Sequence, residues 1–173
     1  MVQSRHTKRS TNMQPIDRKI TLLFRLLMAW TFLYSASHQV LVPNFSVVGF
    51  LNSTKTFHDL FILFTTPTIA PIASFLVEWG HLLIGLSLLV GFCTRISSFF
   101  GIVLLMMYWM AHMDFPYIEN HNNFIIDYHV VYSVVLASLI VRRAGQICGL
   151  DSWASTLPIV RNSAPLRWVF QAA

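Results

Sequence analysis

Four long apolar runs separated by polar segments are the dominant pattern of this chain. They extend from about Ile20 to Val42, Ile72 to Cys93, Ser97 to Met113 and Phe124 to Val141. A helix of roughly 20 apolar residues crosses the hydrocarbon core of a bilayer. The pattern therefore predicts an all-α integral membrane protein, folded as a four-helix bundle. The last two runs are the shortest, so for either of them a buried or interfacial segment is the alternative.

The connection between the first two runs is long and apolar. Within Pro43 to Pro71, the stretch FHDLFILF from Phe57 to Phe64 can form one or two amphipathic helical turns, which the following TTPTIAP ends. This predicts a short helix at the outer membrane interface, with a plain loop as the alternative. Glycosylation sequons that begin at Asn44 and Asn52 agree with an outer location.

Composition and charge support a membrane location and give it a direction. Hydrophobic residues make up 55% of the chain, charged residues 11%, and the mean hydropathy is +0.58. If both termini are cytoplasmic, Lys55 is the only one of 12 Lys and Arg residues in the outer loops. We therefore expect a multi-pass plasma-membrane protein with a basic cytoplasmic N-terminus (1–19), a transmembrane domain (20–141) and a cytoplasmic tail with interfacial aromatics (142–173).

The positions of the basic residues and cysteines argue against a nucleic-acid-binding protein, a cleaved signal peptide and a disulfide. The basic residues flank apolar runs and form no stripe, which argues against a nucleic-acid partner. The polar N-terminus predicts no cleaved signal peptide. Cys93 and Cys148 both fall at predicted cytoplasmic helix ends, where no disulfide is expected.

Ionisable residues inside the apolar runs are costly in a membrane and indicate functional positions. They are Arg25, His38, Glu78, His81, His112, Asp127 and His129. Apart from Arg25, all lie toward the outer ends of their helices, so each predicted helix contributes one or more groups to an outer layer. The alternative explanation for this grouping is that an ionisable residue is least unfavourable near a helix end, close to the membrane interface. Glu78, about 10 Å below the outer end of its helix, is hardest to explain that way.

Helical spacing groups some of these residues. Glu78 and His81 are three positions apart, about 60° around the helix, and suit proton exchange with a quinone. Hydrogen bonding between helices is the alternative role. Asp127 and His129 are about 200° apart on a helix, so the pattern predicts that they do not face a common partner. The predicted catalytic residues are Glu78, His81, Asp127 and His129.

Aromatic and histidine side chains at the same level predict a quinone pocket. The predicted cofactor-binding residues are Tyr132, Trp79, His38 and His112, and Tyr108, Trp109 and Tyr128 are further candidate lining residues. An interfacial belt of Trp and Tyr is the alternative. Glu78-x-x-His81 matches half of a di-iron motif, but its second half is lacking, so no metal is predicted. A single metal held by Glu78, His81, Asp127 and another histidine stays open as an alternative.

Two segments resemble the DoxX/DoxD family of small four-helix membrane proteins. One is FLVEWGHLLIGLSLLVGFCTR (Phe75 to Arg95), and the other is NNFIIDYHVVYSVVLASLIVRRAGQICGLD (Asn122 to Asp151). The stretch from Ser35 to His38 departs from the family's usual Gly-x-x-Lys. In the DoxD branch the resemblance implies the large subunit of thiosulfate:quinone oxidoreductase. The matching positions are Glu78, Gly85, Gly91, Thr94, Arg95, Asn123, Asp127, His129, Gly145, Gly149 and Asp151.

The sequence thus predicts a quinone-interacting subunit of a membrane oxidoreductase, which takes electrons from thiosulfate or another small donor. Its expected partners are membrane lipids, quinone and other membrane subunits. A non-catalytic accessory subunit of a larger redox complex is the alternative. A transporter is a weaker third hypothesis, because no broken helices or repeats are found.

Overall fold

The computed structural model describes residues 14–171 and is about 70% helix. Three helices are long and apolar enough to cross a membrane: α1 (Pro15–Val40), α4 (Ala70–Val90) and α5 (Thr94–Ala111). Only 28–33% of the residues in their apolar stretches are buried inside the protein, as expected where lipid is the solvent. Most of the predicted basic segment 1–19 lies outside the described residues.

The fourth apolar helix is shorter than predicted. α6 (Tyr128–Val141) has 14 residues and spans about 21 Å at 1.5 Å per residue. The expected start at Phe124 is wrong, because Phe124 belongs to a small antiparallel sheet. Its strands are β1 (Met113–Asp114), β2 (Tyr117–Ile118) and β3 (Asn120–Phe124). The polar run between Asp114 and Asn123 thus forms a hairpin-like connection that an all-α prediction did not include.

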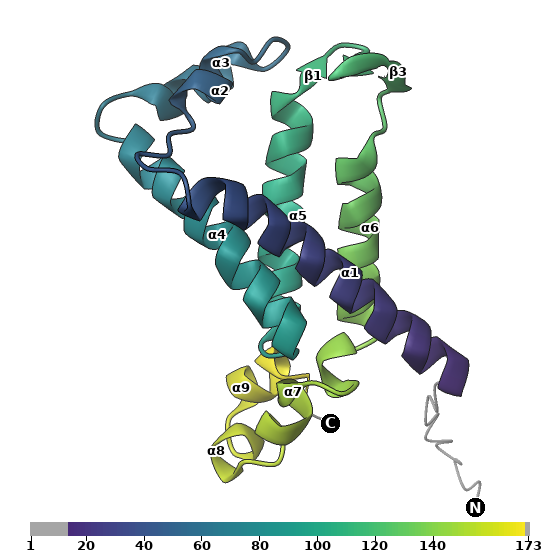
Figure 1. Cartoon of the computed structure of the whole chain (residues 1–173). Coiled ribbons are helices and arrows are strands. Elements are labelled where there is room, and N and C mark those ends of the chain that lie inside the picture. Colours follow the sequence, from purple (N-terminus) through teal and green to yellow (C-terminus); the bar gives the residue numbers. More distant parts are fainter. Residues whose placement is uncertain (1–13, 172–173) are drawn as a thin grey trace, which may run out of the picture.

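The helices pack as two antiparallel pairs. α1 crosses α4, α5 lies beside α6, and α4 against α5 joins the pairs (Figure 1). A Cβ at Gly85 would approach Leu33 Cγ to 2.8 Å, so the absence of a side chain there permits the close α1–α4 crossing. The central core consists of Met28, Ala29, Phe32, Ile84, Leu88, Leu105, Leu136, Leu139 and Ala144.

One end of the bundle, which we call the loop end, carries the two long connections. The first contains α2 (Val48–Asn52), α3 (His58–Phe61) and a 3₁₀ turn, η1 (Ile62–Thr65). The expectation of a short helix within Phe57 to Phe64 is confirmed. The first connection is tied to the sheet by a hydrogen bond from Thr56 N to Met113 O (3.1 Å).

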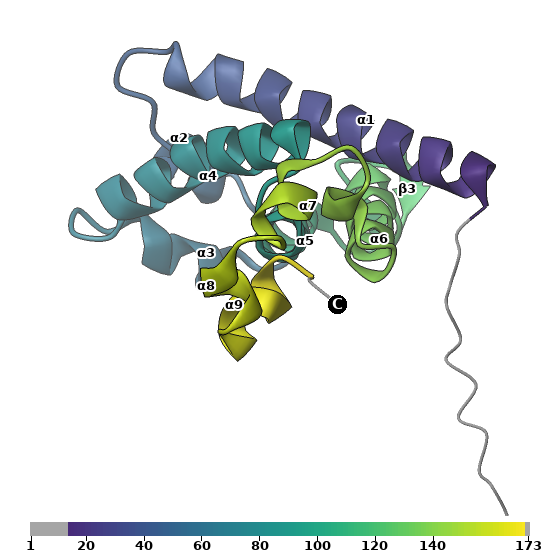
Figure 2. The same ribbon diagram turned by 90° about the horizontal axis from the view of Figure 1, so that it is seen from below.

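The opposite end, which we call the tail end, is covered by short helices. These are η2 (Ala144–Gln146), α7 (Leu150–Ala154), α8 (Pro158–Arg161) and α9 (Ala164–Val169). They lie beneath the ends of α4 and α5 (Figure 1 and Figure 2). Phe170 is buried among their apolar side chains, whereas Trp153 and Trp168 are exposed. The tail is therefore a packed cap with its own small core.

Arg25 of α1 joins this cap to the bundle. The residue is 2% exposed, and its guanidinium donates to the carbonyl oxygens of Ala144 (2.7 Å), Ile147 (2.8 Å) and Cys148 (3.1 Å). Three carbonyl oxygens of the segment that follows α6 thus converge on one cation. Hydrogen bonds to a charged group are about twice as strong as neutral ones.

Asp151 makes the complementary contact from the tail. Its carboxylate accepts from the backbone N–H groups of Cys93 (2.7 Å) and Thr94 (3.1 Å), where α5 begins. Its own N–H donates to Gly91 O (2.9 Å). Burial raises the pKa of the Asp151 carboxyl, and the hydrogen bonds from Thr94 and Cys93 and the charge of Arg25 oppose that shift. A negative group at this helix start is also favoured by the helix dipole.

Substitution of Gly145 by Ala tests how tightly the cap is packed. A Cβ there would lie 1.8 Å from Asp151 Oδ2 and 2.4 Å from Thr94 Oγ1, so the cap must shift. We expect Gly145→Ala to lower the free energy of unfolding by about 2 kcal/mol, a typical cost of overpacking. Gly49→Ala is the matched control, because Gly49 has no atom within 4 Å of its Cβ position. Thermal melting of the purified proteins measures both, and equal melting temperatures would contradict the packing described.

Replacement of Arg25 by Gln tests the tail contact itself. The shorter neutral side chain leaves buried carbonyl oxygens without donors. We therefore expect the free energy of unfolding to fall by about 3 kcal/mol or more. The exposed Arg18 on the same helix provides the control, Arg18→Gln, which removes the same charge without these bonds. Proteolysis of the tail should accelerate in Arg25→Gln alone; unchanged cleavage would show that Arg25 does not hold the cap.

Candidate functional site

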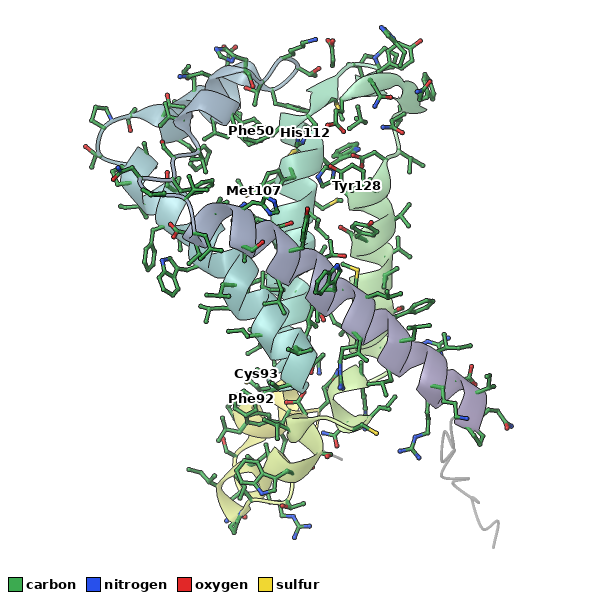
Figure 3. The ribbon with its side chains drawn as sticks, in the orientation of Figure 1. Phe50, Phe92, Cys93, Met107, His112 and Tyr128 are labelled. Atoms are coloured by element: carbon green, nitrogen blue, oxygen red, sulfur yellow. The ribbon has the colours of Figure 1, made fainter. Side chains whose placement is uncertain are left out.

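Rings from three helices gather around Tyr108 near the loop end of the bundle. The Tyr108 ring centroid lies 5.7 Å from that of His81, 5.9 Å from that of His129 and 6.0 Å from that of His112. The His112 and His129 rings are 5.2 Å apart. Figure 3 labels His112 near the loop end of α5. We call His81, Tyr108, His112, His129 and Asp127 the Tyr108 cluster.

Asp127 and His129 are joined by two hydrogen bonds within this cluster. Asp127 Oδ2 lies 2.6 Å from His129 Nδ1, and Asp127 Oδ1 accepts from the backbone N–H of His129 at 3.0 Å. Their side chains are 0% and 5% exposed, respectively. The prediction that the two residues cannot face a common partner does not anticipate this contact. It assumed a continuous helix, whereas Asp127 is the extended N-cap of α6 (φ −130°, ψ −169°) and its side chain folds back.

Hydrogen bonding determines the tautomer of each buried or half-buried histidine in the cluster. His81 Nδ1 lies 2.8 Å from Val77 O, and His112 Nδ1 lies 2.9 Å from Tyr108 O. A carbonyl oxygen only accepts, so each Nδ1 carries the proton. His129 Nδ1 likewise faces a carboxylate. In the neutral form, all three rings thus keep the lone pair of Nε2 for another partner.

The first helix adds a residue that the sequence analysis did not select. Gln39 of α1 approaches the Tyr108 side chain, and within residues 14–171 its buried Oε1 has no hydrogen-bond partner. With Gln39, all four apolar helices contribute a polar group at this level. An amide within the last turn of an apolar helix was the available signal, but it was outweighed by its titratable neighbour His38.

An apolar cavity adjoins the cluster. It has a volume of about 70 Å³ and lies between the first connection and α4 and α5. Its lining residues are Val47, Phe50, Leu51, Phe61, Phe64, Ala73, Val77, Leu104, Met107, Tyr108 and Ala111. Leu104 and Met107 also line an open apolar groove of about 460 Å³ between α4 and α5. Tyr108 therefore lies between the polar rings and an apolar cavity, and Leu104 and Met107 lie between this cavity and the groove.

Glu78 lies apart from the cluster. It is half-buried and lines another groove, with Asn44, Ser46 and Ser74 among its neighbours. Within residues 14–171, no hydrogen bond or ion pair joins Glu78 to His81, although the two are three residues apart. Of the four predicted catalytic residues, His81, Asp127 and His129 thus lie in the Tyr108 cluster, whereas Glu78 lines a separate groove. The rotation of α4 toward its neighbours decides this, which helical spacing alone cannot give.

Of the four predicted cofactor-binding residues, three lie outside the cluster; among the further candidates, the Tyr128 ring lies 4.1 Å from that of His129. His38 is exposed and its Nδ1 contacts Tyr34 O at 3.0 Å. Trp79 is 40% exposed beside Phe75. Tyr132 packs against the central core, one turn below His129. Only His112 of this group joins the rings around Tyr108.

The cluster does not form a preorganised metal site. Across the described part of the chain, no three His, Cys, Asp or Glu side chains are placed to hold a common metal ion. The arrangement instead offers imidazole acceptors and a carboxyl group, with His81, Asp127 and His129 buried. Chemically, it can exchange protons with a bound polar headgroup.

Comparisons with known proteins give one match. No curated protein and no solved structure matches the chain. Residues 20–113, which reach from α1 to the first strand, match the DoxX family. This region includes Tyr108, His81 and His112, while Asp127, His129 and the tail lie beyond it. Because the match covers more than half of the sequence, the chain belongs to the DoxX family.

Proposed function

We propose that this chain is a quinone-interacting subunit of a membrane oxidoreductase, similar to the DoxD branch, and that the quinone headgroup binds beside Tyr108. The observation that carries the proposal is the junction of the Tyr108 cluster with the apolar cavity and groove. The quinone/quinol couple fits this combination: the Tyr108 hydroxyl and a protonated His129 can donate to quinone oxygens, the neutral Nε2 atoms can accept from quinol hydroxyls, and the ring and tail require apolar contacts. Membership of the DoxX family agrees with such a membrane subunit.

In this proposal the chain crosses the plasma membrane four times, with both ends in the cytoplasm. The loop end then faces outward and contains Lys55, while the tail end contains most of the Lys and Arg residues. α6 is the short crossing, and the sheet that precedes it lies at the outer interface together with α2 and α3. The Tyr108 cluster then lies in the outer half of the membrane.

The Asp127–His129 pair has the chemistry to exchange protons with a quinone. Reduction of a quinone to a quinol consumes two electrons and two protons. With its Nδ1 bound to Asp127, a protonated His129 would donate one of these protons from Nε2 to a quinone oxygen, and Asp127 would stabilise the imidazolium before transfer. The second proton would be delivered in the same way after His129 is protonated again from water. The reverse transfer accompanies quinol oxidation. Electrons come from a small donor such as thiosulfate or from a partner subunit.

The other polar groups then position the headgroup. The Tyr108 hydroxyl can donate to the second quinone oxygen, and His81 and His112 place acceptors nearby. Gln39 offers an unpaired buried oxygen that a quinol hydroxyl would satisfy. Glu78 receives no headgroup role here, because it lines a separate groove.

A non-catalytic accessory subunit is the second candidate, and one observation favours it. Asp127 caps α6, and the Nδ1 atoms of His81 and His112 are bound to the carbonyls one turn earlier on their own helices. These contacts suffice for a purely structural cluster. Quinone binding by the isolated chain distinguishes the two candidates.

Replacement of His129 tests the proposed site. In lipid nanodiscs, a fluorescent quinone analogue should bind to His129→Gln about tenfold more weakly than to the unmodified chain, because one charged hydrogen bond is lost. Tyr108→Phe, which removes only a hydroxyl, should weaken binding in the same direction. His38→Gln, at an exposed position outside the cluster, should change binding by less than about twofold. Unchanged binding in correctly folded His129→Gln and Tyr108→Phe would reject the proposal.

Cysteine labelling tests the membrane orientation independently. In a Cys93→Ser background, exposed Cys148 at the tail end should react with a membrane-impermeant maleimide only after the cells are permeabilised. With both native cysteines replaced by Ser, Asn52→Cys in the first connection should react in intact cells. Labelling of Cys148 from outside would contradict the proposed orientation.

A further inference from the structure

A second polar pocket lies at the tail end, opposite the Tyr108 cluster. It has a volume of about 330 Å³ and is formed where the start of α5, the end of α6 and α9 meet. Its lining residues are Arg95, Arg143, Ala164, Arg167, Trp168 and Gln171. Half of these side chains carry a positive charge, and the proposed quinone chemistry uses none of them.

The charge of this pocket is not balanced by a neighbouring acid. Within residues 14–171, the ion pairs join Lys55 to Asp114, His129 to Asp127 and Arg142 to Asp17, so the three pocket arginines take part in none of them. The nearest acid along the chain, Asp151, is occupied by the backbone of Cys93 and Thr94. No Asp or Glu side chain follows it in the sequence. An anion from outside the chain is therefore the natural counter-charge.

The pocket has fixed walls. Arg95 Cζ lies 4.1 Å from the centroid of the Trp168 ring, and its Nη1 donates to Trp168 O at 3.3 Å. Gln171 is 6% exposed, and its Nε2 donates to Ile140 O at 2.6 Å. Its Oε1 is buried without a partner among the described residues. The pocket thus combines three guanidinium groups with one buried acceptor that lacks a donor.

Arg143, which also lines the pocket, has a strained backbone conformation. It follows the C-cap of α6 and lies in the left-handed region (φ 50°, ψ 50°), which residues other than Gly rarely adopt. Such a conformation is strained for a residue with a Cβ atom, and Arg143 lines the pocket in this conformation. Glycine would relieve the strain but would remove the charge.

We propose that this pocket binds a phosphate group, and that its source is the headgroup of an anionic phospholipid such as phosphatidylglycerol. Guanidinium groups suit phosphate because their planar donors match its oxygens. The pocket lies where α5 begins, which is headgroup level if α5 spans the membrane, and the exposed Trp168 ring is typical of that level. A headgroup hydroxyl then supplies the donor that Gln171 Oε1 lacks.

Lipid titration of the full chain tests this site. Native mass spectrometry of the purified protein, titrated with phosphatidylglycerol or phosphatidylcholine, should show preferential retention of phosphatidylglycerol. The double variant Arg143→Gln, Arg167→Gln should reduce the affinity for phosphatidylglycerol by about tenfold or more, because each Lys or Arg near a membrane surface strengthens binding to anionic lipid. Arg161→Gln combined with Arg18→Gln is the matched control, because it removes the same charge from exposed positions outside the pocket.

The competing outcomes are distinct. Equal losses in the double variant and its control would mean that only net charge matters, and would overturn the proposal. Equal retention of the two lipids would also overturn it. Inorganic phosphate that displaces phosphatidylglycerol only at high concentration supports the lipid source, whereas displacement at matching concentrations would assign the pocket to a soluble phosphate instead. Gln171→Leu should reduce the preference for hydroxylated headgroups while leaving phosphate binding intact. An unchanged headgroup preference would contradict the contact proposed for Gln171 Oε1.

Discussion

The buried guanidinium of Arg25 is the contact on which the arrangement of the tail end depends. Burying a cation in this position is costly unless it is hydrogen-bonded, and the carbonyls of Ala144, Ile147 and Cys148 accept from its two terminal nitrogens, Nη1 and Nη2. These carbonyls become available because α6 ends just before them. Asp151 completes the arrangement from the other side at the start of α5. One charged residue on the first helix thereby determines where the last part of the chain lies.

This arrangement also explains several residues that resemble the DoxX/DoxD pattern. Gly149 and Gly91 approach so closely that a Cβ at Gly91 would lie 2.7 Å from Gly149 Cα, and Gly145 lies against Asp151 in the same way. Thr94 supplies one of the N–H donors to Asp151. These positions are explained by packing at the tail end. The polar residues available for chemistry are concentrated instead at the loop end, around Tyr108.

The loop end could be predicted in outline but not in detail. Depth along each helix follows directly from position in the sequence, so the gathering of histidines and acids at one level was predictable. Rotation about each helix axis depends on which neighbour the helix packs against. Glu78 therefore lines a different groove from the one expected, and Tyr108 and Gln39 gained importance. The Asp127–His129 contact arises because α6 starts later than its apolar run, which frees Asp127 to cap it.

The sequence by itself determined the apolar helices, the short helix of the first connection, the polar level at one end and the strong asymmetry of Lys and Arg. All of these depend on local composition or on spacing within one segment. The tertiary structure alone decided the docking of the tail, the start of α6, the membership of the Tyr108 cluster and the meeting of three arginines in one pocket. These depend on contacts between residues far apart in the chain, such as Arg25 with Ala144 and Arg95 with Trp168, whose geometry is set by packing.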